Sequence, residues 1–280
     1  MIKQNKEVID NLKTLQSARF AQAKKWSIAL WAIEGGLLFF AIFLIFFPLD
    51  FFSNPTIVLF CALLTGYVRY KVDEYKANAE YIKRLNEFAD GFDIIPSQHE
   101  LASLEDSISE KSVNSVTNEI KEGVEYYTSE QPGARRALKN LAESAWFTWS
   151  LSKKCFHFLC AVLVLVLIMA YLLFSVYTEY AAKTENIKLG SHLVSAILLF
   201  IVSTGILHSC LGFCHFANEC EEIKKDAFDM LEKPDIEKTD AIMLLSKYQL
   251  IRSQAPMIPT FMWKISRHRL NKIWSNANKK

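Results

Sequence analysis

The stretch CFHFLCAVLVLVLIMAYLLFSVY, residues 155–177, contains no Asp, Glu, Lys or Arg. At a rise of 1.5 Å per residue, a helix of this length reaches about 34 Å, which is enough to cross the ~30 Å hydrocarbon core of a bilayer. Three further apolar runs occupy residues 27–47, 51–68 and 190–213. The sequence therefore predicts a membrane protein with four helical spans.

Positive charge is distributed unevenly around these runs. Of the 32 Lys and Arg residues, only Lys183 and Lys188 fall in the two connections that must share one side of the membrane, and the connection 48–54 has neither residue type. Cytoplasmic loops of membrane proteins are enriched in Lys and Arg. We therefore expect both termini and the long middle segment to be cytoplasmic.

The chain then divides into five segments. They are a cytoplasmic N-terminal helix, a first transmembrane hairpin, a cytoplasmic helical insert, a second transmembrane hairpin and cytoplasmic C-terminal helices, at residues 1–26, 27–68, 69–154, 155–213 and 214–280. Outside the spans, apolar residues recur at steps of three and four, which predicts amphipathic helices. Strand signals are weak. The expected fold is all-α.

Several helix boundaries follow from these stripes and from proline and glycine. The second span is predicted to continue as a helix to Ala89, and the third span to begin as a helix at Ala134, directly after Gln131-Pro132-Gly133. Further helices are predicted after Pro96 and over residues 113–127, 213–231, 235–254 and 260–274. Both hairpins would thus run directly into cytoplasmic helices.

Cysteine and histidine placement argues against disulfides and metal sites. No cysteine falls in a predicted outer loop, so no disulfide framework is expected. His208 and His215 share one helix face, whereas Cys210 and Cys214 point to nearly the opposite one. Such a spread does not match a closed tetrahedral zinc site. We expect no bound metal.

Motifs of conventional catalysis are also missing. The sequence has no Gly-rich phosphate loop, nucleophile elbow, His-Glu-x-x-His or paired acidic motif. We therefore expect no catalytic residue, no cofactor and no enzymatic activity.

Glu34 is the one carboxylate inside a predicted span. A charged residue at the centre of a span costs about 2.5–3.5 kcal/mol on insertion scales and usually has a function. Glu34 and His208 lie at similar predicted depths, so one hypothesis is that they pair or line a cation pathway. The alternative is that Glu34 is a hydrogen-bonding residue in helix packing beside Gly35 and Gly36. Four spans are too few to enclose a wide pore, so conductance would require a homo-oligomer.

One group of candidate ligand-binding cations opens the helix predicted from Ala134. Arg135, Arg136 and Lys139 follow Pro132-Gly133. Free backbone N–H groups at a helix start favour phosphate, and arginine binds it with two hydrogen bonds. We expect an anionic ligand at this position.

A second group combines basic and aromatic residues near the C-terminus. The group consists of Arg252, Trp263, Lys264, Arg267 and Arg269. Trp263 can stack on a base while the arginines hold phosphates, as nucleotide recognition requires. For both groups, the alternative is that the cations belong only to the positive cytoplasmic collar or touch anionic lipid.

Two short stretches resemble a known family. They are the opening helix, with Lys3-Gln4-Asn5, Ala18-Arg19-Phe20 and Ala23-Lys24, and the later Gln249-Leu250-Ile251-Arg252 followed by Ala255-Pro256-Met257-Ile258-Pro259. With the four-span plan and its long middle insert, these residues resemble the SMODS-associating four-transmembrane effectors of bacterial CBASS anti-phage systems.

The resemblance implies a function for the whole chain. It implies an effector in the bacterial inner membrane that binds a cyclic nucleotide made by a companion cGAS-like nucleotidyltransferase, and no nucleic acid polymer. The bound nucleotide would drive oligomerisation and permeabilise or depolarise the lipid bilayer. Two other classes stay open on the residues alone. One is a ligand-independent small ion channel or membrane scaffold whose cytoplasmic helices bind a protein partner. The other is an intramembrane enzyme that uses His157, His192 or His208, which is disfavoured because His192 lies near the outer end of its span and the other two near the inner ends.

Overall fold

The computed structural model describes residues 2–46, 55–121, 130–184 and 205–277. These residues form eight helices and no strand, which confirms the all-α prediction. The helices are α1 (Ile2–Phe46), α2 (Pro55–Phe92), α3 (Gln98–Asp106), α4 (Glu110–Lys121), α5 (Ala134–Thr184), α7 (Ile206–Leu231), α8 (Lys238–Gln254) and α9 (Thr260–Ala277).

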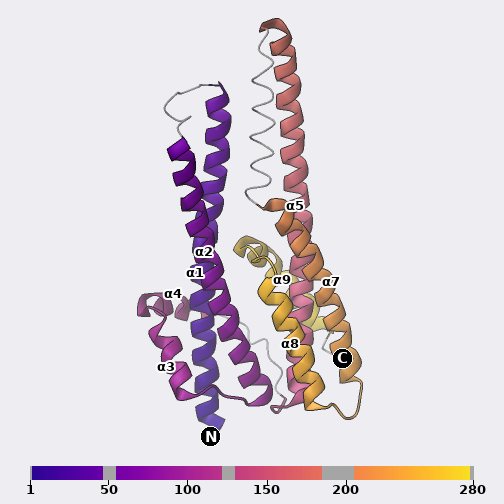
Figure 1. Ribbon diagram of the computed structural model, residues 1–280. Helices are drawn as coiled ribbons and strands as arrows, with labels where there is room; N and C mark the ends of the chain where they lie inside the picture. The colour runs from indigo at the N-terminus through magenta and orange to yellow at the C-terminus, as the bar shows by residue number, and fades with distance from the viewer. Residues whose placement is uncertain (1, 47–54, 122–129, 185–204, 278–280) are drawn as a thin grey trace.

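The helices form two upright halves that stand side by side (Figure 1). In one half α1 packs along α2, and α3 and α4 lie against this pair near its base. In the other half α5 packs along α7, with α8 and α9 against them. The contacts between the halves come mainly from α2, which packs on α5 and α8.

Helices α1, α2 and α5 run without a break from the polar base into apolar sequence. This continuity was predicted for α2 and for α5, and α5 begins at Ala134, directly after Pro132-Gly133. The carbonyl of Gly133 accepts a helical hydrogen bond from the N–H of Ala137 at 3.0 Å. The base and the apolar ends are therefore parts of the same rigid rods.

Helix α5 has the composition and length of a membrane span over Ala134–Leu172. Only 11% of its most apolar 18-residue stretch is buried in the protein. A core helix of a soluble protein would be covered instead. Within the part of the chain that the structure describes, this is the one helix that meets both criteria, so the prediction of four spans stays a prediction.

The fourth predicted run is described only from Gly205 onward. There α7 begins at Ile206, and Gly205 has a φ of 61°, in the left-handed region that glycine enters readily. Downstream, the stripe predicted over 213–231 is the buried face of α7, and the helix ends at Leu231, before Pro234. Residues 48–54 and 190–204 of the predicted connection and run lie outside the described residues.

Arg19 holds the α3–α4 insert against α1. Its Nη2 donates hydrogen bonds to the carbonyl oxygen and the Oγ of Ser107, at 2.6 and 2.9 Å. The helix predicted after Pro96 is confirmed as α3, and the Oγ of Ser97 accepts a hydrogen bond from the backbone N–H of Glu100. The first half thus has its own apolar core, centred on Leu12, Ile82 and Ile108.

Candidate functional site

Charged residues of α2 meet the second half of the molecule along one face. Lys76, Glu80, Lys83, Glu87 and Asp90 recur at steps of three and four and so share one side of the helix. Only the apolar stripe of α2 was used to predict this helix, and no partners were predicted for these charged residues. Their own helical spacing was the signal that they form a second buried face.

Arg252 of α8 is the centre of this interface. Its Nε lies 2.6 Å from Oε2 of Glu80, and its Nη1 lies 2.7 Å from Oε1 of Glu87. Gln249 donates to the other oxygen of Glu87 at 2.9 Å. Arg252 is only 6% exposed, and its Nη2 has no hydrogen-bond partner among the described residues. One guanidinium therefore joins two acids of α2 inside the protein.

The electrostatics favour the charged forms of Arg252 and Glu87. Burial alone would lower the pKa of Arg252, but the carboxylates of Glu87 and Glu80 raise it well above its ordinary value. Burial would likewise raise the pKa of Glu87, yet the charges of Arg252 and Lys83 hold it below its usual value. Lys83 lies 3.7 Å from Glu87, and burial lowers the pKa of this lysine.

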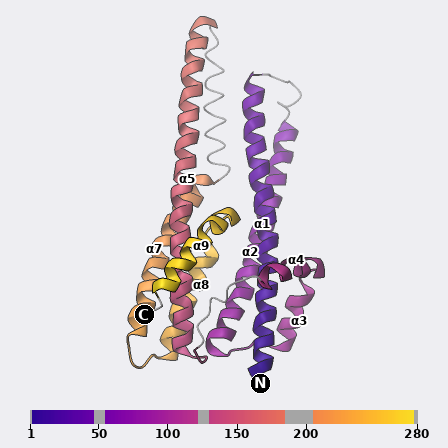
Figure 2. The same ribbon diagram turned by 180° about the vertical axis from the view of Figure 1, so that it is seen from behind.

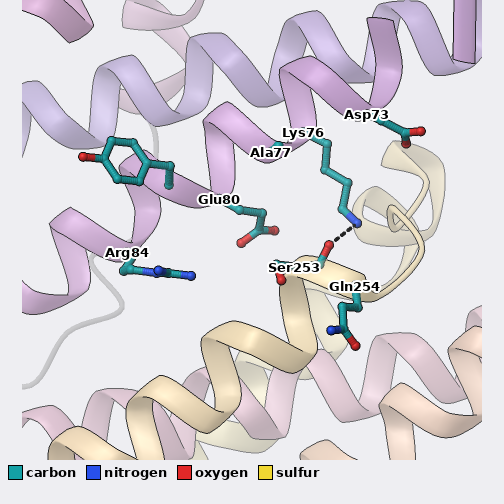
Figure 3. Close-up of a pocket in the computed structure, with 8 residues that line it drawn as sticks. Asp73, Lys76, Ala77, Glu80, Arg84, Ser253 and Gln254 are labelled. Atoms are coloured by element: carbon teal, nitrogen blue, oxygen red, sulfur yellow. Dashed lines mark hydrogen bonds between the residues drawn. The ribbon is translucent and has the colours of Figure 1, made fainter. Parts of the chain in front are cut away.

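A pocket of about 450 Å³ opens beside this cluster, between α2 and the end of α8 (Figure 3). It is lined by Asp73, Lys76, Ala77, Glu80, Tyr81, Arg84, Ser253 and Gln254. Figure 3 shows Lys76, Glu80 and Arg84 reaching from α2 towards α8. The volume is within the range of small-molecule sites.

The cations of this pocket differ in their partners. Lys76 donates to the carbonyl oxygen of Ser253 at 2.9 Å and also to that of Ala255, so it satisfies carbonyls at the C-terminal end of α8. Arg84 is exposed and forms no hydrogen bond or ion pair with the described residues. Arg84 is therefore the cation of the pocket that is available to a ligand.

The first predicted ligand group instead joins α5 to α2. Arg136 pairs with Asp90, with Nη2 at 2.6 Å from Oδ1, and its Nη1 donates to the carbonyl of Glu130. Arg135 donates to the carbonyl of Lys233 at 3.1 Å, and Lys139 pairs with Glu130. Each predicted cation thus has a partner within the chain, and their binding of a ligand stays a prediction.

The backbones of α2 and α5 come close beside this ion pair. The N–H of Gly133 donates to the carbonyl of Gly91 at 2.7 Å. A Cβ added to Gly91 would lie 3.0 Å from the Cβ of Ala137. A larger residue at position 91 would therefore force Ala137 to shift.

The second predicted ligand group is divided between two places. Arg252 is buried against α2, whereas the ring of Trp263 packs on Phe147 of α5, with centroids 6.3 Å apart. Trp263 belongs to an apolar cluster that also includes Trp146 and Trp274. Arg267 is half-buried on α9 and forms no hydrogen bond or ion pair with the described residues. The stacking site proposed from Arg252 and Trp263 together is thus not assembled in this structure.

Glu34 pairs with Arg69, not with His208. Its Oε1 accepts a hydrogen bond from Nη2 of Arg69 at 2.7 Å, and Glu34 is 5% exposed. Both residues are about equally far along the chain from the connection between α1 and α2, which was the missed sequence signal. His208 is exposed on α7. In the structure Glu34 thus pairs with Arg69 in place of His208. A role for Glu34 or His208 in ion passage stays a prediction.

Comparison of the chain with protein-family models, with curated proteins and with solved structures finds no match.

Proposed function

We propose that this protein is a multi-pass membrane effector whose cytoplasmic helices control the packing of two transmembrane hairpins. The hairpins are residues 27–68 and 155–213, and both termini face the cytoplasm. Large apolar side chains exposed on α1, α2 and α5 support this arrangement, among them Phe39, Phe60 and Leu165. A bilayer would remove these apolar side chains from contact with water.

The charged interface between the halves is the observation that carries the proposal. Helices α1, α2 and α5 each run from a predicted span into the cytoplasmic part, and the halves meet through the ion pairs of Glu80, Glu87 and Asp90. A ligand that binds better to one arrangement of this interface shifts the population of both hairpins. The rods carry the change into the membrane because they are unbroken helices.

The activating ligand is a cyclic nucleotide, by the resemblance of the chain to CBASS effectors. The pocket between α2 and α8 supports this ligand class better than the start of α5 does. Arg84 is free to bind a phosphate, and Ser253 and Gln254 offer hydrogen bonds to a base. Binding near Glu80 would act directly on its pair with Arg252.

The output is disruption of the bacterial inner membrane by an oligomer. A single chain is expected to supply only four spans, so a conducting or disruptive assembly needs several copies. Depolarisation by this assembly would stop the growth of an infected cell, and a companion nucleotidyltransferase would make the nucleotide.

The test uses the full chain in vesicles that contain a self-quenched dye. A panel of cyclic di- and trinucleotides is added, and dye release is compared with a sample without nucleotide. We expect release with one nucleotide, and loss of this response in Arg84→Ala. Lys225→Ala is the matched control, since Lys225 is an exposed cation on α7 outside the pocket.

Two results would contradict the proposal. Release with no dependence on any nucleotide would favour the ligand-independent channel. No release with any nucleotide, from protein that is inserted in the vesicles, would favour a scaffold regulated by a protein partner. A normal response in Arg84→Ala, with response lost in Arg135→Ala/Arg136→Ala, would move the ligand to the start of α5.

A further inference from the structure

Helix α9 is basic in its middle turns. It carries Lys264, Arg267, Arg269 and Lys272 and contains no Asp or Glu. Its buried residues are Met262, Ser266 and Leu270, each one turn from the next. The helix therefore has one narrow packed face and leaves most of its circumference to other contacts.

The exposed face of α9 starts apolar and ends basic. Ile265 is 75% exposed, and Phe261 is also exposed one turn earlier. At 100° per residue, Arg269 lies about 40° and Lys272 about 20° from Ile265 on the helix circumference. Lys264 lies about 100° from Ile265. All three cations are exposed and form no hydrogen bond or ion pair with the described residues.

The start of α9 lies where α5 becomes apolar. The ring of Phe261 packs against Phe158 of α5, with centroids 5.3 Å apart, and Met262 lies in a cluster with Cys155 and Leu159. Figure 2 shows α9 crossing the second half obliquely, below the long apolar part of α5. Lys154 of α5 donates to Ser266 at 2.9 Å and adds a further cation at this level.

We propose that α9 binds the anionic phospholipids of the adjoining leaflet. Phe261 and Ile265 enter the boundary between head groups and acyl chains, and Lys264, Arg269 and Lys272 pair with lipid phosphates. An amphipathic helix with a basic polar face lies in this interface for the same reasons. The inference rests on the proposed insertion of the hairpins, because the bilayer must begin next to Phe158.

A lipid surface fits these residues better than a soluble nucleotide does. The cations are spread over two turns of an exposed helix face, whereas the ligand-sized pocket described above lies elsewhere, between α2 and α8. Phe261 and Ile265 also lie one turn apart on this face, and together they offer apolar surface that the acyl chains of a bilayer can cover.

The test places a polarity-sensitive dye on α9. The full chain with Ile265→Cys is labelled with a nitrobenzoxadiazole (NBD) fluorophore and reconstituted in vesicles of phosphatidylcholine, with or without phosphatidylglycerol. Wild-type protein treated in the same way corrects for labelling of native cysteines. We expect stronger, blue-shifted emission when phosphatidylglycerol is present. Added KCl should reverse the increase, because salt screens the lipid phosphates.

Two charge variants decide whether α9 is responsible. Lys264→Gln/Arg269→Gln/Lys272→Gln should lose the phosphatidylglycerol-dependent increase. The control Lys111→Gln/Lys225→Gln/Lys233→Gln removes the same charge from exposed positions on other segments and should keep it. Equal emission in both vesicle types, or a full increase in the α9 variant, would overturn the proposal. So would an increase produced in phosphatidylcholine vesicles by a soluble cyclic dinucleotide.

Alkaline carbonate extraction separates this inference from the proposed function. Protein that is extracted from the vesicles is not inserted, which overturns both proposals. Inserted protein that responds to phosphatidylglycerol but releases no dye with any nucleotide retains the lipid surface and contradicts the gated effector.

Discussion

Helix α2 presents different side chains on the face towards α1 and on the face towards α5 and α8. Towards α1 it presents Ile82, which lies in an apolar cluster with Leu12. Towards α5 and α8 it presents the acids Glu80, Glu87 and Asp90, each paired with an arginine. The first face holds one half together. The second joins the two halves, with the help of Phe92 at the end of α2, which is buried in an apolar cluster with Ala137 of α5 and Ala241 of α8.

The difference indicates which contact is suited to change. Apolar packing is non-directional, and opening it exposes surface to water, so α1 and α2 are expected to stay together. A buried ion pair costs desolvation that roughly balances its attraction, so it adds little net stability while it fixes one geometry. A ligand or water can replace one of its partners. The charged face is therefore the place where the halves can change their arrangement.

The largest effect should follow the loss of Arg252. Arg252→Met leaves Glu80 and Glu87 buried without their cation, which we expect to lower the free energy of unfolding by about 3–5 kcal/mol. Denaturant unfolding in detergent, followed by circular dichroism, measures this loss. The triple variant Arg252→Met/Glu80→Gln/Glu87→Gln should recover part of it. If the single variant is as stable as wild type, the charged face does not hold the halves together.

The apolar face should be nearly as sensitive, for another reason. Ile82 is 1% exposed, and Ile82→Ala removes three carbons from a packed core, at a cost of about 3 kcal/mol. The same unfolding experiment measures it. Unlike Arg252→Met, this variant should not be rescued by neutralising acids on α2. Rescue by Glu80→Gln/Glu87→Gln would contradict the separation of the two faces.

Crowding the backbone contact between the halves should lower the free energy of unfolding by a smaller amount. In Gly91→Val the added side chain meets Ala137, whose Cβ would lie 3.0 Å from the new Cβ. We expect a loss of about 2 kcal/mol from overpacking. Gly66→Val is the matched control on the same helix, because its Cβ would have no neighbour within 4 Å. Equal stability of the two variants would show that α2 and α5 do not approach closely.

The smallest change in stability is expected for Glu143, an acid that has no ion-pair partner among the described residues. Glu143 of α5 is half-buried, forms no hydrogen bond or ion pair with the described residues, and burial raises its pKa to about 7. The folded state thus favours the protonated form, and stability falls as the pH rises from about 4.5 to about 7. Glu143→Gln should therefore stabilise the protein at pH 8 by about 1 kcal/mol, a value reduced for solvent screening.

The pH dependence of this gain is its own control. At pH 4.5 the carboxyl is neutral in the folded state, so Glu143→Gln should have little effect there. Thermal unfolding at both pH values measures the difference. An equal gain at both would mean that the side chain, not its charge, is responsible.

Local sequence predicted most helix boundaries. Pro132-Gly133 marked the start of α5, Pro96 preceded α3, and the stripe ending at Leu231 became the buried face of α7. These features depend on neighbours within about four residues, which a pattern reports directly. The helix start at Ile206 inside a predicted span was missed, because Gly205 alone does not indicate its backbone angle.

The partners of charged residues could not be predicted in the same way. Arg252 and Glu80 lie far apart in the chain, and α8 must fold against α2 before they meet. Local sequence led to the prediction that Arg136 and Arg252 bind a ligand, and it gave no sign that acids of α2 pair with them. For Glu34, the symmetry of the α1 and α2 hairpin contained the information, since it places Arg69 at the same height.

The length of α5 has a mechanical consequence. The helix has 51 residues and therefore measures about 76 Å from the glycine contact at its base to its far end. As a lever, a tilt of about 5° at the base would displace the far end by about 7 Å, more than a full helix pitch. A small displacement of side chains near Asp90 would thus become a larger displacement of the far end of α5, roughly in proportion to the distance from the glycine contact at its base.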